Sequence, residues 1–265
     1  MNIKTVELPN SLKMEYVEQG DPSGRQIIFL HGYPDSWQSY ATVLPYLPAN
    51  IHAYAPSQRG HGNTDRPGQG YDPKDFAADL ALFMDQLNID AAVIVGHSMG
   101  ATIAQRFALD YPEKTKGLIL IGGFSTFIGN ENLTELLEAV NALSDPVDRD
   151  FMEEFQISTV VHPLGASYLK TLVDESLKLP ARVLKAVLSQ LVKVDYTREL
   201  PSLKVKVLLV WGDQDNLTGR ENQDQFLRLI AGSRLSVYNG IGHSVHWEEP
   251  ERFANEVEEF LTHIK

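Results

Sequence analysis

Hydrophobic residues follow two different patterns along this chain of 265 residues. Near the start, apolar and polar residues alternate over residues 3–8 and 12–18, which is typical of half-buried strands joined by a hairpin turn. From residue 27 onward, apolar residues form short continuous runs instead, at residues 27–30, 51–55, 93–95, 118–121 and 205–210. Such runs suit strands that are covered on both faces, as in a parallel sheet packed between helices.

Segments with helical periodicity separate these runs, at residues 37–47, 75–87, 101–110, 222–230 and 251–264. Alternation of strands and helices predicts βαβ units. We therefore expect the α/β class, with a doubly wound, mostly parallel sheet. In such sheets ligands bind beyond the carboxyl ends of the strands, so the candidate chemistry is sought there.

One long segment interrupts the alternation. Residues 124–198 contain four amphipathic helical patterns, at 133–143, 148–155, 166–177 and 181–191, and no convincing buried strand. We predict a core formed by residues 1–123 and 199–265, with a helical cap, residues 124–198, inserted between two strands of the sheet. A separate all-helical domain is the alternative, but no flexible linker marks either boundary.

The composition is ordinary for a globular protein, with 43% apolar and 22% charged residues. The chain has 23 basic and 35 acidic residues and a net charge of −12, which argues against nucleic acid and anionic membrane surfaces as partners. It has no cysteine, which excludes disulfides, cysteine–zinc sites and a cysteine nucleophile. We see no signal peptide or membrane span, and we expect a cytoplasmic protein that is a monomer or small homo-oligomer.

The strongest chemical signal is the sequence GHSMG at residues 96–100. It follows an apolar run and precedes a helical pattern, which is the context that a G-x-S-x-G nucleophile elbow requires. Gly96 and Gly100 leave room where the strand and the helix pass closest. Ser98 is then the candidate nucleophile, at a helix N-terminus that favours nearby negative charge.

A serine nucleophile needs a base and a third group that orients the base. His243, in the glycine-flanked loop of residues 239–247, is the favoured base, and His246 is its competitor. The acid should follow the strand of residues 207–211, where Asp213 and Asp215 both occur. From the residues alone the choice leans only slightly to Asp215, because Asp213 is well placed to cap the turn through its own backbone.

An oxyanion hole needs two backbone amides. Met99 supplies one, directly after the nucleophile. The loop of residues 31–37, which follows an inner strand, supplies the other at Tyr33, whose side chain is then free to line the pocket. The same loop can be simply a helix start, with Asp35 or Ser36 as N-cap, and both interpretations are compatible.

Together these segments resemble the α/β-hydrolase superfamily over nearly the whole chain. Residues 31–34 look like the HGxP oxyanion motif, residues 58–67 are similar to the RGxGxSxxP loop with Thr64 at the usual serine, residues 212–215 match the GxxD acid turn, and residues 242–243 match the base loop. In that turn the last residue is the family's catalytic carboxylate, so the resemblance implies Asp215. The nearest branches are epoxide hydrolases, haloalkane dehalogenases, C–C bond hydrolases, cofactor-free haloperoxidases and carboxylesterases or lactonases.

The resemblance also implies a reaction. Epoxide hydrolases and haloalkane dehalogenases use an aspartate nucleophile, whereas this chain has Ser98, so we expect acyl transfer on a small ester or lactone. The alternatives are a C–C bond hydrolase, with Arg182, Lys193 or Arg198 binding a carboxylate, a perhydrolase side activity, or a receptor that retains the triad. We expect neither a cofactor nor a metal. The residues expected around the substrate are Tyr33, Trp37, Phe124, Phe127, Phe155 and His246, although aromatic residues of a cap more often simply form its core.

Overall fold

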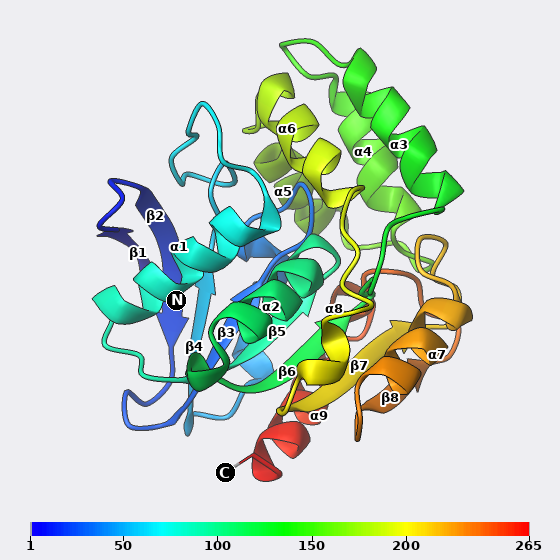
Figure 1. The fold of residues 1–265 in the computed structure, drawn as a ribbon. Coiled ribbons are helices and arrows are strands. Elements are labelled where there is room, and N and C mark those ends of the chain that lie inside the picture. The colour runs from blue at the N-terminus through cyan, green and yellow to red at the C-terminus, as the bar shows by residue number, and fades with distance from the viewer. Residues whose placement is uncertain (1, 265) are drawn as a thin grey trace.

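The computed structural model describes residues 2–264, and an eight-stranded sheet runs through its centre (Figure 1). The order of the strands across the sheet is β1-β2-β4-β3-β5-β6-β7-β8. The first strand pairs antiparallel with the second, and the second with the fourth, while all other neighbours are parallel. The strands are β1 (Asn2–Glu7), β2 (Lys13–Gln19), β3 (Arg25–Leu30), β4 (Ile51–Pro56), β5 (Ala92–His97), β6 (Thr115–Ile121), β7 (Lys206–Gly212) and β8 (Arg234–Tyr238). The predicted hairpin and the mostly parallel, doubly wound sheet are confirmed.

Alternate residues of the central strands enter two separate cores, one on each face of the sheet. Ile28 and Leu30 face α1 (Pro73–Gln86), α2 (Met99–Asp110) and Phe226 of α7 (Arg220–Leu229). Ile27 and Phe29 face the side that holds α8 (Val245–Glu248) and α9 (Pro250–Thr262). Every residue of β5 is buried, because helices cover both faces there. This two-sided burial is the physical reason for the continuous apolar runs in the sequence.

Residues 37–47 do not form the single helix that their periodicity predicts. They form two short 3₁₀ segments instead, η1 (Trp37–Tyr40) and η2 (Leu44–Tyr46). Pro45 lies at the start of the second segment, and a proline there has no N–H for a helical hydrogen bond and collides with the preceding turn. Two other 3₁₀ segments are η3 (Pro112–Lys114) and η4 (Leu200–Ser202).

Four helices lie between β6 and β7, at the top of Figure 1. They are α3 (Glu131–Ala142), α4 (Arg149–Ser158), α5 (Ala166–Ser176) and α6 (Ala181–Leu191), and we call them the insertion. Asn130 and Asp148 cap α3 and α4, since each side chain accepts a hydrogen bond from a first-turn amide.

The chain enters and leaves the insertion at neighbouring points. A β-bridge pairs Thr126 with Asp195, and two backbone hydrogen bonds flank it, each 2.9 Å long, from Phe127 N to Val194 O and from Tyr196 N to Ser125 O. We call residues 125–127 and 194–196 the connecting ribbon. The ribbon holds together the segment that enters the insertion and the segment that leaves it, above the carboxyl ends of the strands.

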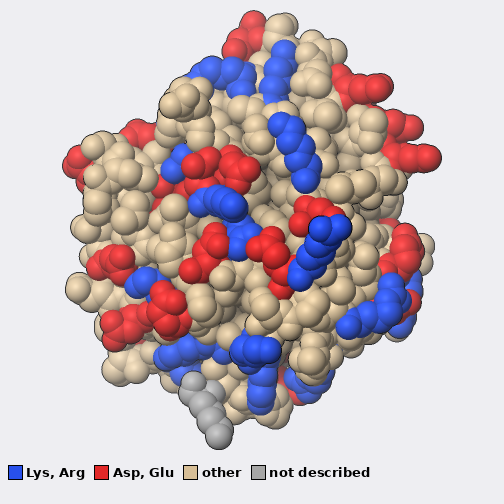
Figure 2. All heavy atoms as spheres, in the orientation of Figure 1, with Lys and Arg blue, Asp and Glu red and all other residues tan. Residues whose placement is uncertain are grey.

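Acidic and basic side chains are interspersed on the face shown in Figure 2. Arg106 pairs with both Asp110 and Glu199, and Lys114 pairs with Asp85. Glu131, Glu135 and Glu138 are exposed along α3, the helix at the upper right of Figure 1. Among residues 2–264, no helix combines the length and the hydropathy that a membrane span requires.

Candidate active site

The serine of the GHSMG sequence lies in a sharp turn between β5 and α2. Ser98 has a φ of 51° and a ψ of −111°, which a residue other than glycine rarely adopts. A Cβ on Gly96 would lie 2.2 Å from the carbonyl oxygen of Gly100, and a Cβ on Gly100 would lie 2.1 Å from that of Leu30. Both positions therefore exclude any side chain. The Ser98 amide donates to the Ile121 carbonyl at 2.9 Å, which ties the turn to the end of β6.

The side chain of Ser98 is partly exposed, whereas its neighbours His97 and Met99 are buried. The hydroxyl therefore lies at the end of a central strand and at a helix N-terminus, and it is open on one side. An incoming carbonyl group can reach it there.

His243 and Asp215 come from two separate loops and lie against each other. His243 Nδ1 is 2.8 Å from Asp215 Oδ2, and both side chains are almost completely buried. The other oxygen of Asp215 accepts hydrogen bonds from the amides of Leu217 at 2.8 Å and Thr218 at 2.9 Å, and the Thr218 hydroxyl donates to Oδ2. Burial alone would raise the pKa of Asp215, but the imidazole and the Thr218 donors outweigh it, so that the pKa lies below its usual value.

The competing aspartate of the same turn has a different contact. Asp213 is exposed, and its Oδ1 accepts a hydrogen bond from the Gly240 amide at 2.6 Å. It joins the acid turn to the start of the base loop and does not touch the imidazole of His243.

The imidazole of His243 lies beside the serine turn. A Cβ on Gly122, the residue after Ile121, would come within 2.8 Å of the His243 ring, and the His97 ring centroid is 4.9 Å from that of His243. Nε2 of His243 is buried and has no hydrogen-bond partner within residues 2–264, Ser98 included. Hydrogen bonds between nucleophile and base often tighten only when substrate is bound. The arrangement therefore provides an oriented imidazole with one free nitrogen.

Two backbone amides near the serine are free of acceptors in the described part of the chain. One belongs to Met99, the first residue of α2, and the other to Tyr33 in the loop after β3. The loop lies so close to α2 that only glycine at position 100 fits against the carbonyl oxygens of Leu30 and His31. Free amides on these two elements are suited to holding a negatively charged oxygen.

The aromatic residues expected around the substrate separate into two groups. Tyr33 and Phe155 are partly exposed, with ring centroids 6.2 Å apart, and the Tyr33 hydroxyl donates to the Leu184 carbonyl of α6 at 3.3 Å. Phe124 and Phe127 stack on each other in the core between the sheet and the insertion, with 1% and 5% of their surfaces exposed. In this structure Phe124 and Phe127 pack and do not line open space.

Trp37 and His246, the other two residues predicted to contact the substrate, are buried as well. Trp37 packs with Phe29 and Tyr40 on the opposite face of the sheet from Met99. His246 is completely buried, and its Nε2 is 3.0 Å from the Ser39 hydroxyl. Their positions follow from the short 3₁₀ segment and from α8, which turn these side chains into the core.

The histidines that surround His243 are held neutral. Burial, with smaller contributions from His246 and His243, lowers the pKa of His97 well below its usual value. Burial, and secondarily His243, lowers the pKa of His246 to about 3. Neutral neighbours add no positive charge beside the base. Within the described residues no group of three or more histidine, aspartate or glutamate side chains could hold a metal ion.

A buried carboxyl group joins the loop of residues 31–37 to the insertion. Asp35 is 1% exposed, and its Oδ1 accepts a hydrogen bond at 3.0 Å from Nε2 of Gln156, a buried residue of α4. Burial raises the pKa of Asp35 to about 7, and Gln156, His243 and Ser39 offset only part of that effect. The N-cap of η1 is Ser36, which accepts from the Gln38 amide at 3.2 Å, so Asp35 is free for this contact. No sequence pattern marks a partner 121 residues away.

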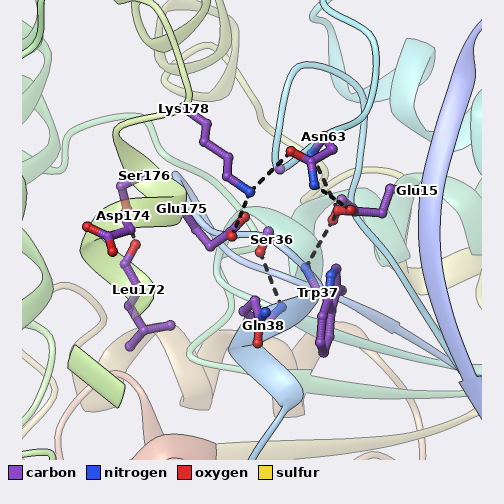
Figure 3. Close-up of polar contacts among 12 residues, drawn as sticks. Glu15, Ser36, Trp37, Gln38, Asn63, Leu172, Asp174, Glu175, Ser176 and Lys178 are labelled. Carbon is purple, nitrogen blue, oxygen red and sulfur yellow. Dashed lines mark hydrogen bonds and ion pairs between the residues drawn. The ribbon is translucent and has the colours of Figure 1, made fainter. Parts of the chain in front are cut away.

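A second polar chain joins α5 to the core (Figure 3). Just beyond α5, Lys178 Nζ donates to Asn63 Oδ1 at 3.1 Å, and Asn63 Nδ2 donates to Glu15 Oε1 at 2.6 Å. The other oxygen of Glu15 accepts from the Ser57 hydroxyl at 3.0 Å, and Ser57 in turn accepts from the Trp37 amide at 3.3 Å. The loop of residues 58–67 is therefore attached both to the sheet and to the insertion.

Comparison with known proteins agrees with this architecture. The profile of a family described as "alpha/beta hydrolase fold" matches residues 26–250. The chain is 29% identical to a protein of Bacillus subtilis (strain 168) named "Putative 2-succinyl-6-hydroxy-2,4-cyclohexadiene-1-carboxylate synthase", over all of both chains. It is 28% identical to the "Putative non-heme chloroperoxidase" of Synechocystis sp., over 94% of this chain and 95% of that protein. The structure of the esterase RhEst1 from Rhodococcus sp. ECU1013 superposes on all of both chains with a TM-score of 0.89 at 23% identity, a likeness of fold.

Proposed function

Because this chain belongs to the alpha/beta-hydrolase fold family, we propose that it hydrolyses carboxylic esters or lactones through an acyl-enzyme formed on Ser98. The family and the esterase-like fold support a hydrolase. The observation that carries the finer proposal is the 2.8 Å contact of Asp215 with His243 Nδ1, beside the serine turn. With Nδ1 donating to the carboxylate, Nε2 carries the lone pair that can accept a proton.

Acylation uses these groups in turn. Ser98 Oγ attacks the carbonyl carbon of the ester while His243 Nε2 takes the hydroxyl proton, and the carbonyl electron pair moves onto oxygen. The resulting oxyanion accepts hydrogen bonds from the amides of Tyr33 and Met99, each of which lowers the activation barrier by on the order of 3 kcal/mol. When the intermediate collapses, the bond to the leaving oxygen breaks and His243 gives its proton to that oxygen. Asp215 stabilises the imidazolium throughout.

Deacylation repeats the steps with water. His243 removes a proton from the water as it attacks the acyl carbon, the bond to Ser98 Oγ breaks, and the proton passes to Oγ. The products are a carboxylic acid and the restored serine. A lactone releases both product groups as one hydroxy acid.

Charge around the site favours a neutral substrate. The three cations considered for binding a carboxylate, Arg182, Lys193 and Arg198, are all exposed on the insertion or beside it. Arg182 uses two nitrogens on the carbonyl oxygens of Arg66 and Pro67, both at 3.0 Å. These contacts give no support to a C–C hydrolase or to another enzyme that recognises a carboxylate. We propose further that the insertion acts as a cap, since Tyr33 and Phe155 meet from opposite sides of the interface.

The test is hydrolysis of a panel of p-nitrophenyl esters and lactones, with a ring-fission diketone as the competing substrate. Ser98→Ala should lower kcat for the best ester by a factor on the order of 10⁵ or more without changing the folded state. Ester turnover that survived this replacement would refute the acyl-enzyme. Turnover of the diketone alone would replace the ester proposal with C–C bond hydrolysis.

A further inference from the structure

The residue five positions after His243 connects the base loop to the insertion. The carboxylate of Glu248 is 1% exposed. Its Oε1 accepts a hydrogen bond from the Gly242 amide at 2.8 Å. Its Oε2 accepts from the amides of Val161 at 3.1 Å and His162 at 2.7 Å, and lies 2.9 Å from His162 Nδ1. One buried side chain therefore serves as acceptor for two segments that are 80 residues apart in the sequence.

A second contact joins the same two segments. The Ser244 amide donates to the Thr159 carbonyl at 3.0 Å, and the Ser244 hydroxyl donates to the Thr159 hydroxyl at 3.0 Å. A Cβ on Gly242 would lie 2.8 Å from the Thr159 carbonyl oxygen and 3.2 Å from Glu248 Oε1. The residues on both sides of His243 are thus pressed against the end of α4 with no side chain between the backbones.

The chemistry of the contact requires a carboxylate. Burial of a charge is costly unless hydrogen bonds replace its hydration, and here backbone amides of both segments supply them. Both oxygens of a carboxylate are acceptors, whereas glutamine offers one acceptor and one donor. Glutamine could keep the contact with Gly242 or the contact with residues 161–162, but would face an amide donor with its own N–H₂ at the other.

We propose that Glu248 is a positioning residue for His243, and that the insertion sets the position of the base through it. The proposal rests on the function proposed above for His243. Glu248 does not touch the reacting atoms; it acts through the backbone of Gly242, which fixes where the imidazole begins. The insertion is then part of the framework of the active site and more than a cover over it.

The experiment compares Glu248→Gln with Glu249→Gln, a neighbour whose side chain is half-buried and takes no part in the contact. A misplacement of about 1 Å in a reacting group can cost up to about 100-fold in rate. The assays are made at a temperature below the melting transition of each variant. We expect Glu248→Gln to lower kcat for the best ester by about 10- to 100-fold and to keep KM within twofold of the wild-type value. Glu249→Gln should retain wild-type kcat. An equal kcat for the two variants overturns the proposal.

Two further measurements keep the outcome decisive. If Glu248→Gln does not fold, Gly242→Ala pushes the base loop away from Thr159 with Glu248 intact, and full kcat in that variant overturns the proposal. If the wild-type protein hydrolyses no ester, the proposed function fails, and Glu248 is tested without substrate by the low-field proton NMR signal of the His243–Asp215 hydrogen bond, assigned by its loss in Asp215→Asn. That signal should shift or vanish in Glu248→Gln and persist in Glu249→Gln. An unchanged signal in both overturns the positioning role.

Discussion

Replacing Asp35 by asparagine should change how the stability of the protein depends on pH. Burial raises the pKa of Asp35 from 3.8 to about 7 in the folded protein. A group that binds its proton more tightly when folded makes the folded state lose stability as pH rises from the unfolded pKa to the folded one. At about 1.4 kcal/mol for each pH unit, the difference between 3.8 and about 7 corresponds to about 4 kcal/mol.

This penalty is distributed over a defined pH range. Well below pH 3.8 the carboxyl is protonated in both states and carries no penalty. About 1.5 kcal/mol of the stability is lost by pH 5, and nearly all of the 4 kcal/mol by pH 8. Asparagine is nearly isosteric and neutral, and its oxygen can still accept the hydrogen bond from Gln156. The variant should therefore gain stability relative to the wild type by about 2.5 kcal/mol between pH 5 and pH 8.

Urea denaturation followed by circular dichroism at pH 5, 6, 7 and 8 measures this difference. The exposed Asp90, changed to asparagine, is the matched control, and its curve should run parallel to that of the wild type. If the free energies of unfolding of Asp35→Asn and wild type also run parallel over this range, Asp35 does not hold its proton in the folded state and the reasoning is refuted.

The remaining predictions concern the two turns of the proposed catalytic site. Asp215→Asn should lower kcat by about 10⁴-fold because the imidazole loses its orienting carboxylate. Asp213→Asn should retain most of kcat and reduce the melting temperature. Equal losses of kcat in p-nitrophenyl ester assays would contradict the assignment of Asp215 as the acid. Gly100→Ala should prevent the elbow from closing, because the new Cβ would lie 2.1 Å from the Leu30 carbonyl oxygen, and soluble protein with wild-type melting behaviour and activity would contradict the clash.

Much of the fold could be predicted because the relevant signals are local. The apolar runs of β3 to β7 indicate burial on both faces of the sheet. The glycines of GHSMG indicate a close approach of strand to helix, which the structure has at Gly96 and Gly100. Periodicity wrongly predicts a single helix over residues 37–47, because Pro45 interrupts a helix whatever the hydrophobic pattern.

The contacts that could not be predicted are those between distant segments. Asp35 meets Gln156 across 121 residues and Glu248 meets Val161 across 87, and neither pair has a spacing or pattern that marks it. Glu248 appears in the sequence only as one of several helix-forming acidic residues. His246 resembles a pocket residue in sequence, but the side of α8 on which it lies faces the core, which only the packed structure determines.

The connecting ribbon has a consequence for exchanging parts between relatives. Because Thr126 and Asp195 are paired neighbours, the helices between them can be excised and another cassette joined at the same two points without stretching the sheet. A grafted cassette must also present two amides to Glu248 and a donor to Asp35, since each carboxyl would otherwise be left buried without its partner. Chimeras whose cassettes supply these donors should be active, and chimeras whose cassettes match only the length of the natural segment should be poor catalysts even with an intact serine, histidine and aspartate.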